Sequence, residues 1–125
     1  PFVPYLPTLE GLAADANVSL TFRRFPIRDN FAPTIKTAHE IVAYIDSQIE
    51  AGISTYLHCW GGRGRTGTIV ACYLLRHGRA NIQNVIRVVE QLRLNDPTGG
   101  LAPETNAQRE FLAEFAKTCG EQQTE

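Results

Sequence analysis

Three absences narrow the kinds of protein that this 125-residue sequence can encode. It has no run of eighteen apolar residues and no basic segment followed by an apolar one, so neither a membrane span nor a signal peptide is predicted. It also has no basic excess, since its formal net charge is -1, which disfavours nucleic acid and anionic membrane surfaces as partners. We therefore expect one soluble cytoplasmic domain that binds any anion through a local site.

Cysteine is scarce, and its spacing is not that of a disulfide framework or a zinc site. Cys59, Cys72 and Cys119 are odd in number and lack C-x-x-C spacing. Such usage is typical of a reducing compartment, in which a thiol nucleophile stays usable. We expect Cys72 in the core on a buried helix, and Cys119 in a polar tail over residues 118–125 that frays.

Hydrophobic periodicity divides the chain into helices and two short strands. Alternating apolar and polar residues predict a strand over 18–22, and β-branched and aromatic residues predict a buried strand over 53–57. Strand, glycine loop and helix in this order predict a three-layer α/β domain over residues 1–125, with a small, mainly parallel central sheet flanked by helices. The expected helices cover residues 8–16, 34–51, 66–76, 82–92 and, with Pro103 in the first turn, 103–115.

The ten residues from His58 to Gly67 contain one cysteine, four glycines and two arginines. Glycines let the backbone turn with positive φ, so that successive N–H groups point inward and form a concave nest for an anion. The helix that begins near Arg65 adds its positive dipole end to the same place. This segment therefore predicts a phosphate-binding loop made of Trp60, Gly61, Gly62, Arg63, Gly64 and Arg65.

Arg65 and Cys59 are the residues that we expect to carry the chemistry. The planar guanidinium group of Arg65 matches two phosphate oxygens and never loses its charge. The same positive field would stabilise a thiolate at Cys59, because cations and helix N-termini lower the pKa of cysteines to roughly 3.5–7.5. Cys59 could instead be a buried structural cysteine, but an exposed glycine-rich turn is a poor place to bury one.

The segment resembles the signature of protein tyrosine and dual-specificity phosphatases, His-Cys followed by five residues and Arg-Ser/Thr, here His58, Cys59, Arg65 and Thr66. It looks most like the bacterial dual-specificity-like members. The resemblance implies that Cys59 attacks phosphorus, that Thr66 stabilises the thiolate and that His58 orders the loop. It also implies a general acid upstream, which we assign to Asp29 in a loop with a trailing proline.

The resemblance is weaker near the two ends of the chain. The segment from Glu104 to Gln108 is similar to the glutamine-bearing segment that positions the hydrolytic water in tyrosine phosphatases, which makes Gln108 a candidate. Glu104, however, stands where those enzymes carry a glutamine. Family members usually have a strand or two before the position of Pro1, so the domain could be incomplete at its N-terminus.

The expected function is hydrolysis of phosphotyrosine, and of phosphoserine and phosphothreonine as further candidates, through a cysteinyl-phosphate intermediate without metal or cofactor. The partner would be a phosphorylated protein or another phosphomonoester. One alternative is a phospholipid or phosphoinositide phosphatase, because some such relatives carry a basic residue where Arg63 stands. Arg63 could also be only a solvated loop residue. The other alternative, a phosphate-binding module without turnover, ranks low because Cys59, Arg65 and Asp29 are all present.

Overall fold

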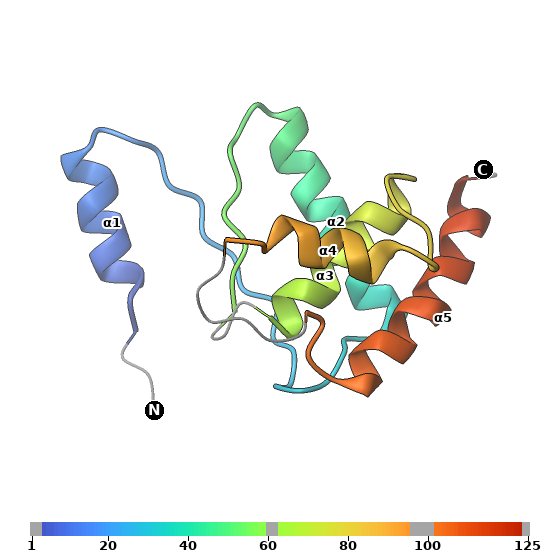
Figure 1. Cartoon of the computed structure of the whole chain (residues 1–125). Coiled ribbons are helices and arrows are strands. Elements are labelled where there is room, and N and C mark those ends of the chain that lie inside the picture. The colour runs from blue at the N-terminus through green and yellow to red at the C-terminus, as the bar shows by residue number, and fades with distance from the viewer. Residues whose placement is uncertain (1–3, 60–62, 96–101, 124–125) are drawn as a thin grey trace.

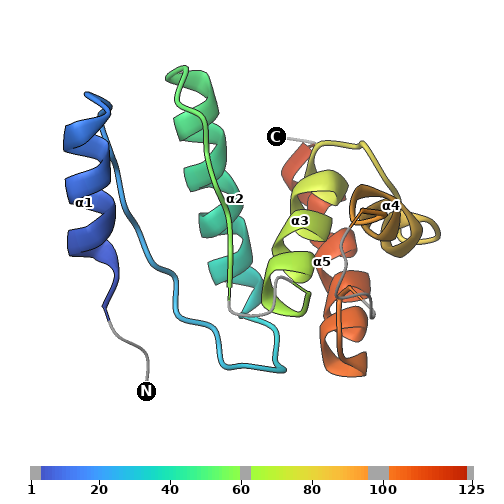
Figure 2. The ribbon, with the colours of Figure 1, turned by 60° about the vertical axis from the view of Figure 1, so that its left-hand side comes forward.

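The computed structural model describes residues 4–59, 63–95 and 102–123, and these residues form five helices. Helices α2 to α5 make a cluster with α3 at its centre, because α3 packs against each of the other three (Figures 1 and 2). Helix α1 stands apart from this cluster in both views, and none of its residues is buried. The helices are α1 (Leu6–Asp15), α2 (Ile35–Glu50), α3 (Arg65–Arg76), α4 (Val85–Leu92) and α5 (Asn106–Gln123).

Local signals explain where α2 and α3 begin and end. The hydroxyl of Thr34 caps α2 by accepting a hydrogen bond from the Thr37 amide at 3.1 Å. Gly52 follows α2 with φ 77°, and Gly78 follows α3 with φ 66°, a left-handed conformation that glycine adopts without strain. The predicted helices over 34–51 and 66–76 are therefore confirmed to within a residue at each end.

The two later helices begin after their predicted starts. Helix α4 begins at Val85 because Asn81 and Asn84 exchange two side-chain to backbone hydrogen bonds, of 2.9 and 3.0 Å, in a turn before it. Helix α5 begins at Asn106, so Pro103 precedes the helix instead of lying in its first turn. It also continues to Gln123, and Cys119, which we expected in a fraying tail, is buried in the core.

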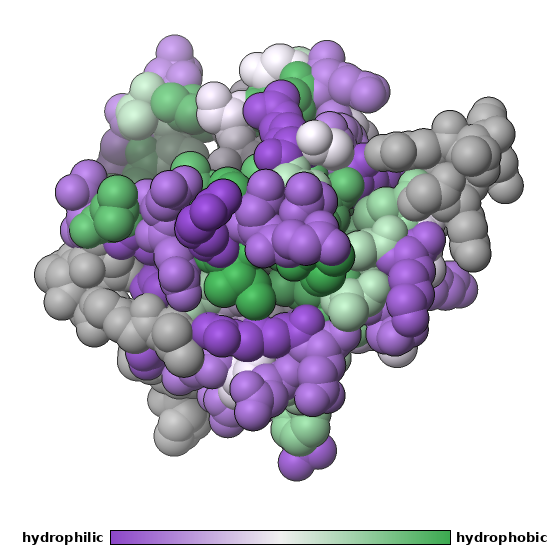
Figure 3. Space-filling model, turned by 45° about the vertical axis from the view of Figure 1, so that its right-hand side comes forward, coloured by the Kyte–Doolittle hydropathy of each residue, from purple (hydrophilic) through white to green (hydrophobic). Residues whose placement is uncertain are grey.

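The core lies where α3 meets its three neighbours. Helix α3 contributes seven buried residues, including Cys72 as predicted, so it is buried on most of its circumference. Within the described part of the chain, helices α2, α4 and α5 each bury fewer residues than α3. On the face shown in Figure 3 hydrophilic residues surround a narrow hydrophobic band. The most deeply buried hydrophobic residues are Ala38, Val42, Ala71, Cys72, Val85, Val89, Ala102, Leu112 and Phe115.

The described residues contain no strand and no sheet, so the predicted α/β class with a central sheet is wrong for this structure. Residues 18–28 and 53–59 run as extended chain, but within the described residues no backbone ladder joins either segment to a neighbour. A strand exists only as part of a ladder, and alternation indicates an extended backbone without specifying its partner. Tyr56, for example, is 86% exposed.

The 53–57 segment nevertheless lies against the helical cluster. Ile53 and Leu57 line an apolar hollow together with Ile45 of α2 and Tyr73 of α3. The predicted site therefore follows an extended segment that packs against two helices. It does not lie at the edge of a sheet within the described residues. In the part of the chain that the structure describes, none of the helices has the length and apolar character needed to cross a bilayer.

Candidate active site

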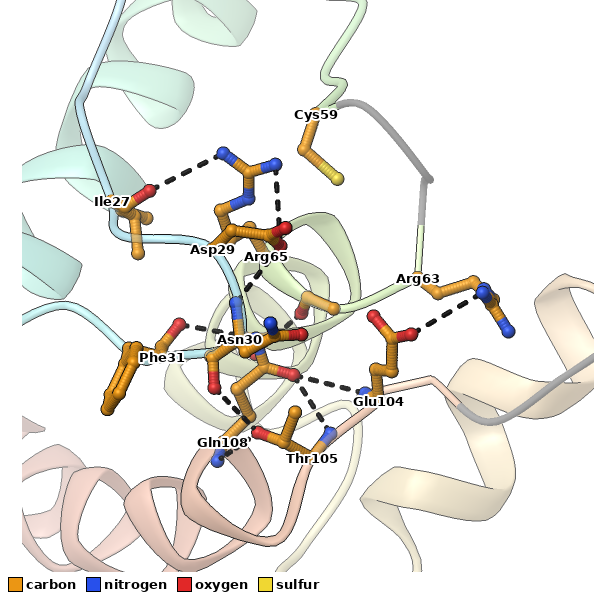
Figure 4. A network of polar contacts seen from close by, with 12 residues as sticks. Ile27, Asp29, Asn30, Phe31, Cys59, Arg63, Arg65, Glu104, Thr105 and Gln108 are labelled. Carbon is orange, nitrogen blue, oxygen red and sulfur yellow. Dashed lines mark hydrogen bonds and ion pairs between the residues drawn. The ribbon is translucent and has the colours of Figure 1, made fainter.

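The loop between the extended segment and α3 carries the predicted nucleophile and the predicted phosphate-binding arginine. Cys59 ends the extended segment and is half-buried, and Arg65 is the first residue of α3. In Figure 4 the Cys59 side chain lies beside the guanidinium group of Arg65, with its sulfur directed away from that group in this view. Trp60, Gly61 and Gly62 lie outside the described residues, so their contribution to a phosphate nest stays a prediction.

Arg65 is held by the loop that carries the predicted general acid. Its Nη1 donates to the carbonyl oxygen of Ile27 at 3.4 Å, and its Nη2 lies 3.6 Å from Oδ1 of Asp29. Its Nε is buried and has no hydrogen-bond partner within the described residues. The structure thus brings together two predicted site residues that are far apart in the sequence, and it leaves Arg65 with a donor to spare.

The acid loop, residues 27–31, is a tight turn around Asp29. The Phe31 amide donates to the Arg28 carbonyl at 3.0 Å, and Asn30 adopts φ 70°, which asparagine tolerates better than most residues. The Asn30 amide donates to Oδ1 of Asp29 at 3.0 Å. The carboxylate of Asp29 is 70% exposed, so the ion pair with Arg65 is solvent-screened and contributes at most about 1 kcal/mol.

Thr66 and His58 also lie at the predicted positions next to the loop. The hydroxyl of Thr66 is buried and has no hydrogen-bond partner within the described residues, which leaves it available to a neighbouring anion. The His58 ring contacts the hydroxyl of Tyr5 at 3.1 Å and the carbonyl of Cys59 at 3.2 Å. His58 therefore links the loop to the residue before α1.

Gln108 is fully buried and uses both ends of its amide. Its Oε1 accepts from the amides of Glu104 and Thr105, each at 3.1 Å, and its Nε2 donates to the Phe31 carbonyl at 3.2 Å. All three partners are backbone groups, so this geometry favours a role in holding loops. The role that the resemblance implies for Gln108, positioning a water, stays a prediction.

Thr105 is a residue of this network that our sequence reasoning missed. Its hydroxyl donates to the Asn30 carbonyl at 2.9 Å and accepts from the Gln108 amide at 3.2 Å (Figure 4). Thr105 and Gln108 form a reciprocal capping box at the start of α5. The Thr-x-x-Gln spacing was the available signal, but it indicates a helix start and not the distant loop that the hydroxyl reaches.

The segment from Glu104 to Gln108 also lies against Arg63 and Gly64 of the predicted phosphate-binding loop. Nη2 of Arg63 lies 3.4 Å from Oε1 of Glu104, and both side chains are partly exposed. A Cβ at Gly64 would lie 3.0 Å from Nε2 of Gln108, so a side chain at this position would require the Gln108 amide to shift. Glu104, which departs from the family pattern, therefore neutralises part of the charge that Arg63 brings to the loop.

The other two cysteines are poor nucleophiles in this fold. Burial raises the pKa of the Cys72 thiol far above its usual value. Burial also raises the pKa of Cys119, an effect that nearby Arg76 partly opposes. None of the described cysteines forms a disulfide, and the described ranges hold no group of three His, Cys, Asp or Glu side chains that could bind a metal.

A cysteine and an arginine on one loop, with an aspartate held beside that arginine by another loop, are the groups that cysteine-dependent phosphoester hydrolysis requires. The comparison with known families supports the coarser class, a phosphatase. The chain belongs to the family described as "Polymorphic toxin system, DSP-PTPase phosphatase", whose model matches residues 7–79, a span that includes Asp29, Cys59 and Arg65.

Curated relatives include both lipid and protein phosphatases. A phosphatidylglycerophosphate phosphatase of Arabidopsis thaliana is 36% identical over 93 residues, which cover 74% of this chain and 38% of that protein. Dual specificity protein phosphatase 1 of Mus musculus is 32% identical over 73 residues, covering 58% of this chain and 20% of that protein. An uncharacterised protein of Methanocaldococcus jannaschii is 33% identical over 92 residues, covering 74% of this chain and 57% of that protein. The chain thus spans less than two thirds of each.

Proposed function

We propose that this chain hydrolyses phosphotyrosine monoesters through a cysteinyl-phosphate intermediate on Cys59, with phosphoserine and phosphothreonine as slower substrates. The observation that supports this most strongly is the pairing of Arg65 with Asp29 at 3.6 Å, next to the loop that carries Cys59. In this proposal Arg65 binds the phosphate, Asp29 donates the proton and Cys59 is the nucleophile. Membership of the DSP-PTPase phosphatase family supports the same reaction class.

In the first step the thiolate of Cys59 attacks phosphorus, so an S–P bond forms while the P–O ester bond breaks. The protonated carboxyl group of Asp29 gives its proton to the leaving oxygen, which departs as a neutral alcohol or phenol. Arg65 binds two of the equatorial oxygens and stabilises the charge that they carry. In the structure the same guanidinium group pairs with Asp29, so phosphate competes with that carboxylate for Arg65.

In the second step a water molecule attacks phosphorus and the S–P bond breaks, which releases inorganic phosphate and the thiolate. The carboxylate of Asp29, having lost its proton in the first step, accepts one from the water. The buried hydroxyl of Thr66 donates a hydrogen bond to the departing thiolate. Each turnover returns Cys59 and Asp29 to their starting states.

A phospholipid or phosphoinositide monoester is the second candidate substrate. Relatives named phosphatidylglycerophosphate phosphatase and phosphatidylinositol 3,4,5-trisphosphate 3-phosphatase favour it, and so does the second arginine of the loop, Arg63. Against the phosphoinositide form stands Glu104, whose carboxylate already pairs with Arg63 and would repel a second phosphate.

A substrate panel separates these candidates. Release of inorganic phosphate is measured from a phosphotyrosine peptide, a phosphoserine peptide, and vesicles containing phosphatidylglycerophosphate or a phosphoinositide, with Cys59→Ser as the control. We expect the highest kcat/KM on the phosphotyrosine peptide. Turnover of lipid vesicles alone would replace the first candidate by the second, and phosphate binding without any turnover would indicate a binding module.

A further inference from the structure

Three carbonyl groups of the acid loop are held by side chains from outside that loop. Arg65 donates to the carbonyl of Ile27, Thr105 to that of Asn30 and Gln108 to that of Phe31, at 3.4, 2.9 and 3.2 Å. Asp29 lies between the first and second of these residues. Figure 4 shows the turn placed between α3 on one side and the start of α5 on the other.

These three contacts differ in what happens to them when a phosphate binds. Arg65 belongs to the phosphate site, so an incoming dianion competes both for its pair with Asp29 and for its bond to Ile27. Thr105 and Gln108 bear no charge and bond only to backbone groups, so a phosphate offers them no better partner. During turnover, the contacts from α5 are therefore the ones that persist on the acid loop.

We propose that Thr105 and Gln108 are positioning residues that hold Asp29 within reach of the leaving oxygen after Arg65 has turned to the phosphate. This inference rests on the proposed function, and it assigns to the start of α5 control over proton transfer. The capping box suits the task because both side chains are fixed by reciprocal bonds, and Gln108 is fully buried. Their donors therefore point toward the acid loop without reorganisation.

Thr105→Val tests the proposal because it keeps the shape of the side chain and removes the hydroxyl that reaches Asn30. kcat/KM is measured on a phosphotyrosine peptide, whose leaving oxygen needs a proton, and on 4-nitrophenyl phosphate, whose leaving oxygen needs little help. We expect the loss on the peptide to exceed the loss on nitrophenyl phosphate by roughly 10-fold or more. Thr105→Ser, which keeps the hydroxyl, should restore the parent ratio.

Thr118→Val is the matched control on the same helix. The Thr118 hydroxyl also makes two hydrogen bonds, to the Phe115 carbonyl at 2.7 Å and to the His39 ring at 2.8 Å, but it does not contact the acid loop. This variant should keep the parent ratio even if it lowers the melting temperature. Equal losses on both substrates in Thr105→Val, or the same ratio change in Thr118→Val, would overturn the proposal.

Gln108→Met provides a second variant in case Thr105→Val does not fold. It keeps the length of the buried side chain, puts no charge into the core, and removes the amide donor to the Phe31 carbonyl. We expect the same selective loss of kcat/KM on the peptide. An unchanged ratio between the two substrates would refute the positioning role. Asp29→Asn in the same series separates the proposed function from the positioning role. If Asp29→Asn slows the peptide far more than nitrophenyl phosphate, and the variants of Thr105 and Gln108 do not, only the positioning role is refuted.

Discussion

Asp29→Asn should change phosphate binding and catalysis in opposite directions. The Asp29 carboxylate lies 3.6 Å from the Arg65 guanidinium group, the cation that we propose binds the phosphate. The substitution keeps the size of the side chain and removes both its negative charge and its dissociable proton. Phosphate then no longer competes with a carboxylate for Arg65, but the leaving oxygen has no proton donor.

The exposure of Asp29 limits the gain in binding. A pair of unit charges at about 4 Å is worth about 1 kcal/mol in water, and Asp29 is 70% exposed. Inorganic phosphate should therefore bind Asp29→Asn more tightly, by up to roughly 5-fold. The loss of acid catalysis is larger, because removing a general acid typically costs roughly 100-fold or more on esters of poor leaving groups.

Calorimetric titration with inorganic phosphate and steady-state assays on two substrates measure these effects. Turnover of the phosphotyrosine peptide should fall far more than that of 4-nitrophenyl phosphate, and the alkaline limb of the pH profile should flatten while the acidic limb persists. Asp46→Asn, which breaks the remote 2.8 Å pair with His77, is the control. Equal losses on both substrates with an intact alkaline limb would refute the assignment and direct attention to Glu104 or to Asp96, which lies outside the described residues.

Three further predictions follow from the charges and burial in the structure. Iodoacetate should label Cys59 well before Cys72 and Cys119, whose thiol pKa values burial raises, and phosphate should protect Cys59; equal labelling of all three by peptide mass mapping would contradict this. Arg63→Ala should lower turnover of a phosphoinositide by roughly 10-fold and leave phosphotyrosine nearly unchanged, whereas equal small effects would indicate a solvated loop residue. Burial and the Arg76 guanidinium lower the pKa of His39. As the pH falls through about 6.5, the imidazole is therefore protonated in the unfolded chain before it is protonated in the folded chain. The free energy of unfolding in urea should therefore decrease below that pH, and less so in His39→Gln.

The helices could be predicted from the sequence because their determinants are local. The stripe of apolar residues in 34–51 and the glycines at 52 and 78 define segments whose hydrogen bonds are satisfied within the segment. The sheet could not be predicted in the same way, because pairing depends on distant residues. Residues 18–22 and 53–57 have the composition of strands, and their extended backbone is observed, but the partner that would make either one a strand is not encoded in its own pattern.

The same division applies to the site. The spacing between Cys59 and Arg65 lies within one loop and could be recognised directly, whereas Asp29 was assigned from a family resemblance, and its contact with Arg65 emerges only in the fold. Thr105 was missed because its hydroxyl serves two roles, and only the capping role has a local signature. Gln108 was predicted to position the hydrolytic water, and the structure shows its side-chain amide hydrogen-bonded to three backbone groups.

Trapping of the covalent intermediate tests the central claim most directly. The protein is mixed with excess 4-nitrophenyl phosphate, quenched in acid within milliseconds and mapped by mass spectrometry, alongside Cys59→Ser. We predict a single phosphorylated peptide with the phosphate on Cys59, a burst of nitrophenol equal to the enzyme concentration, and neither signal in Cys59→Ser, which should still bind phosphate. Phosphate on any other residue, or turnover by Cys59→Ser near the parent rate, would contradict the account.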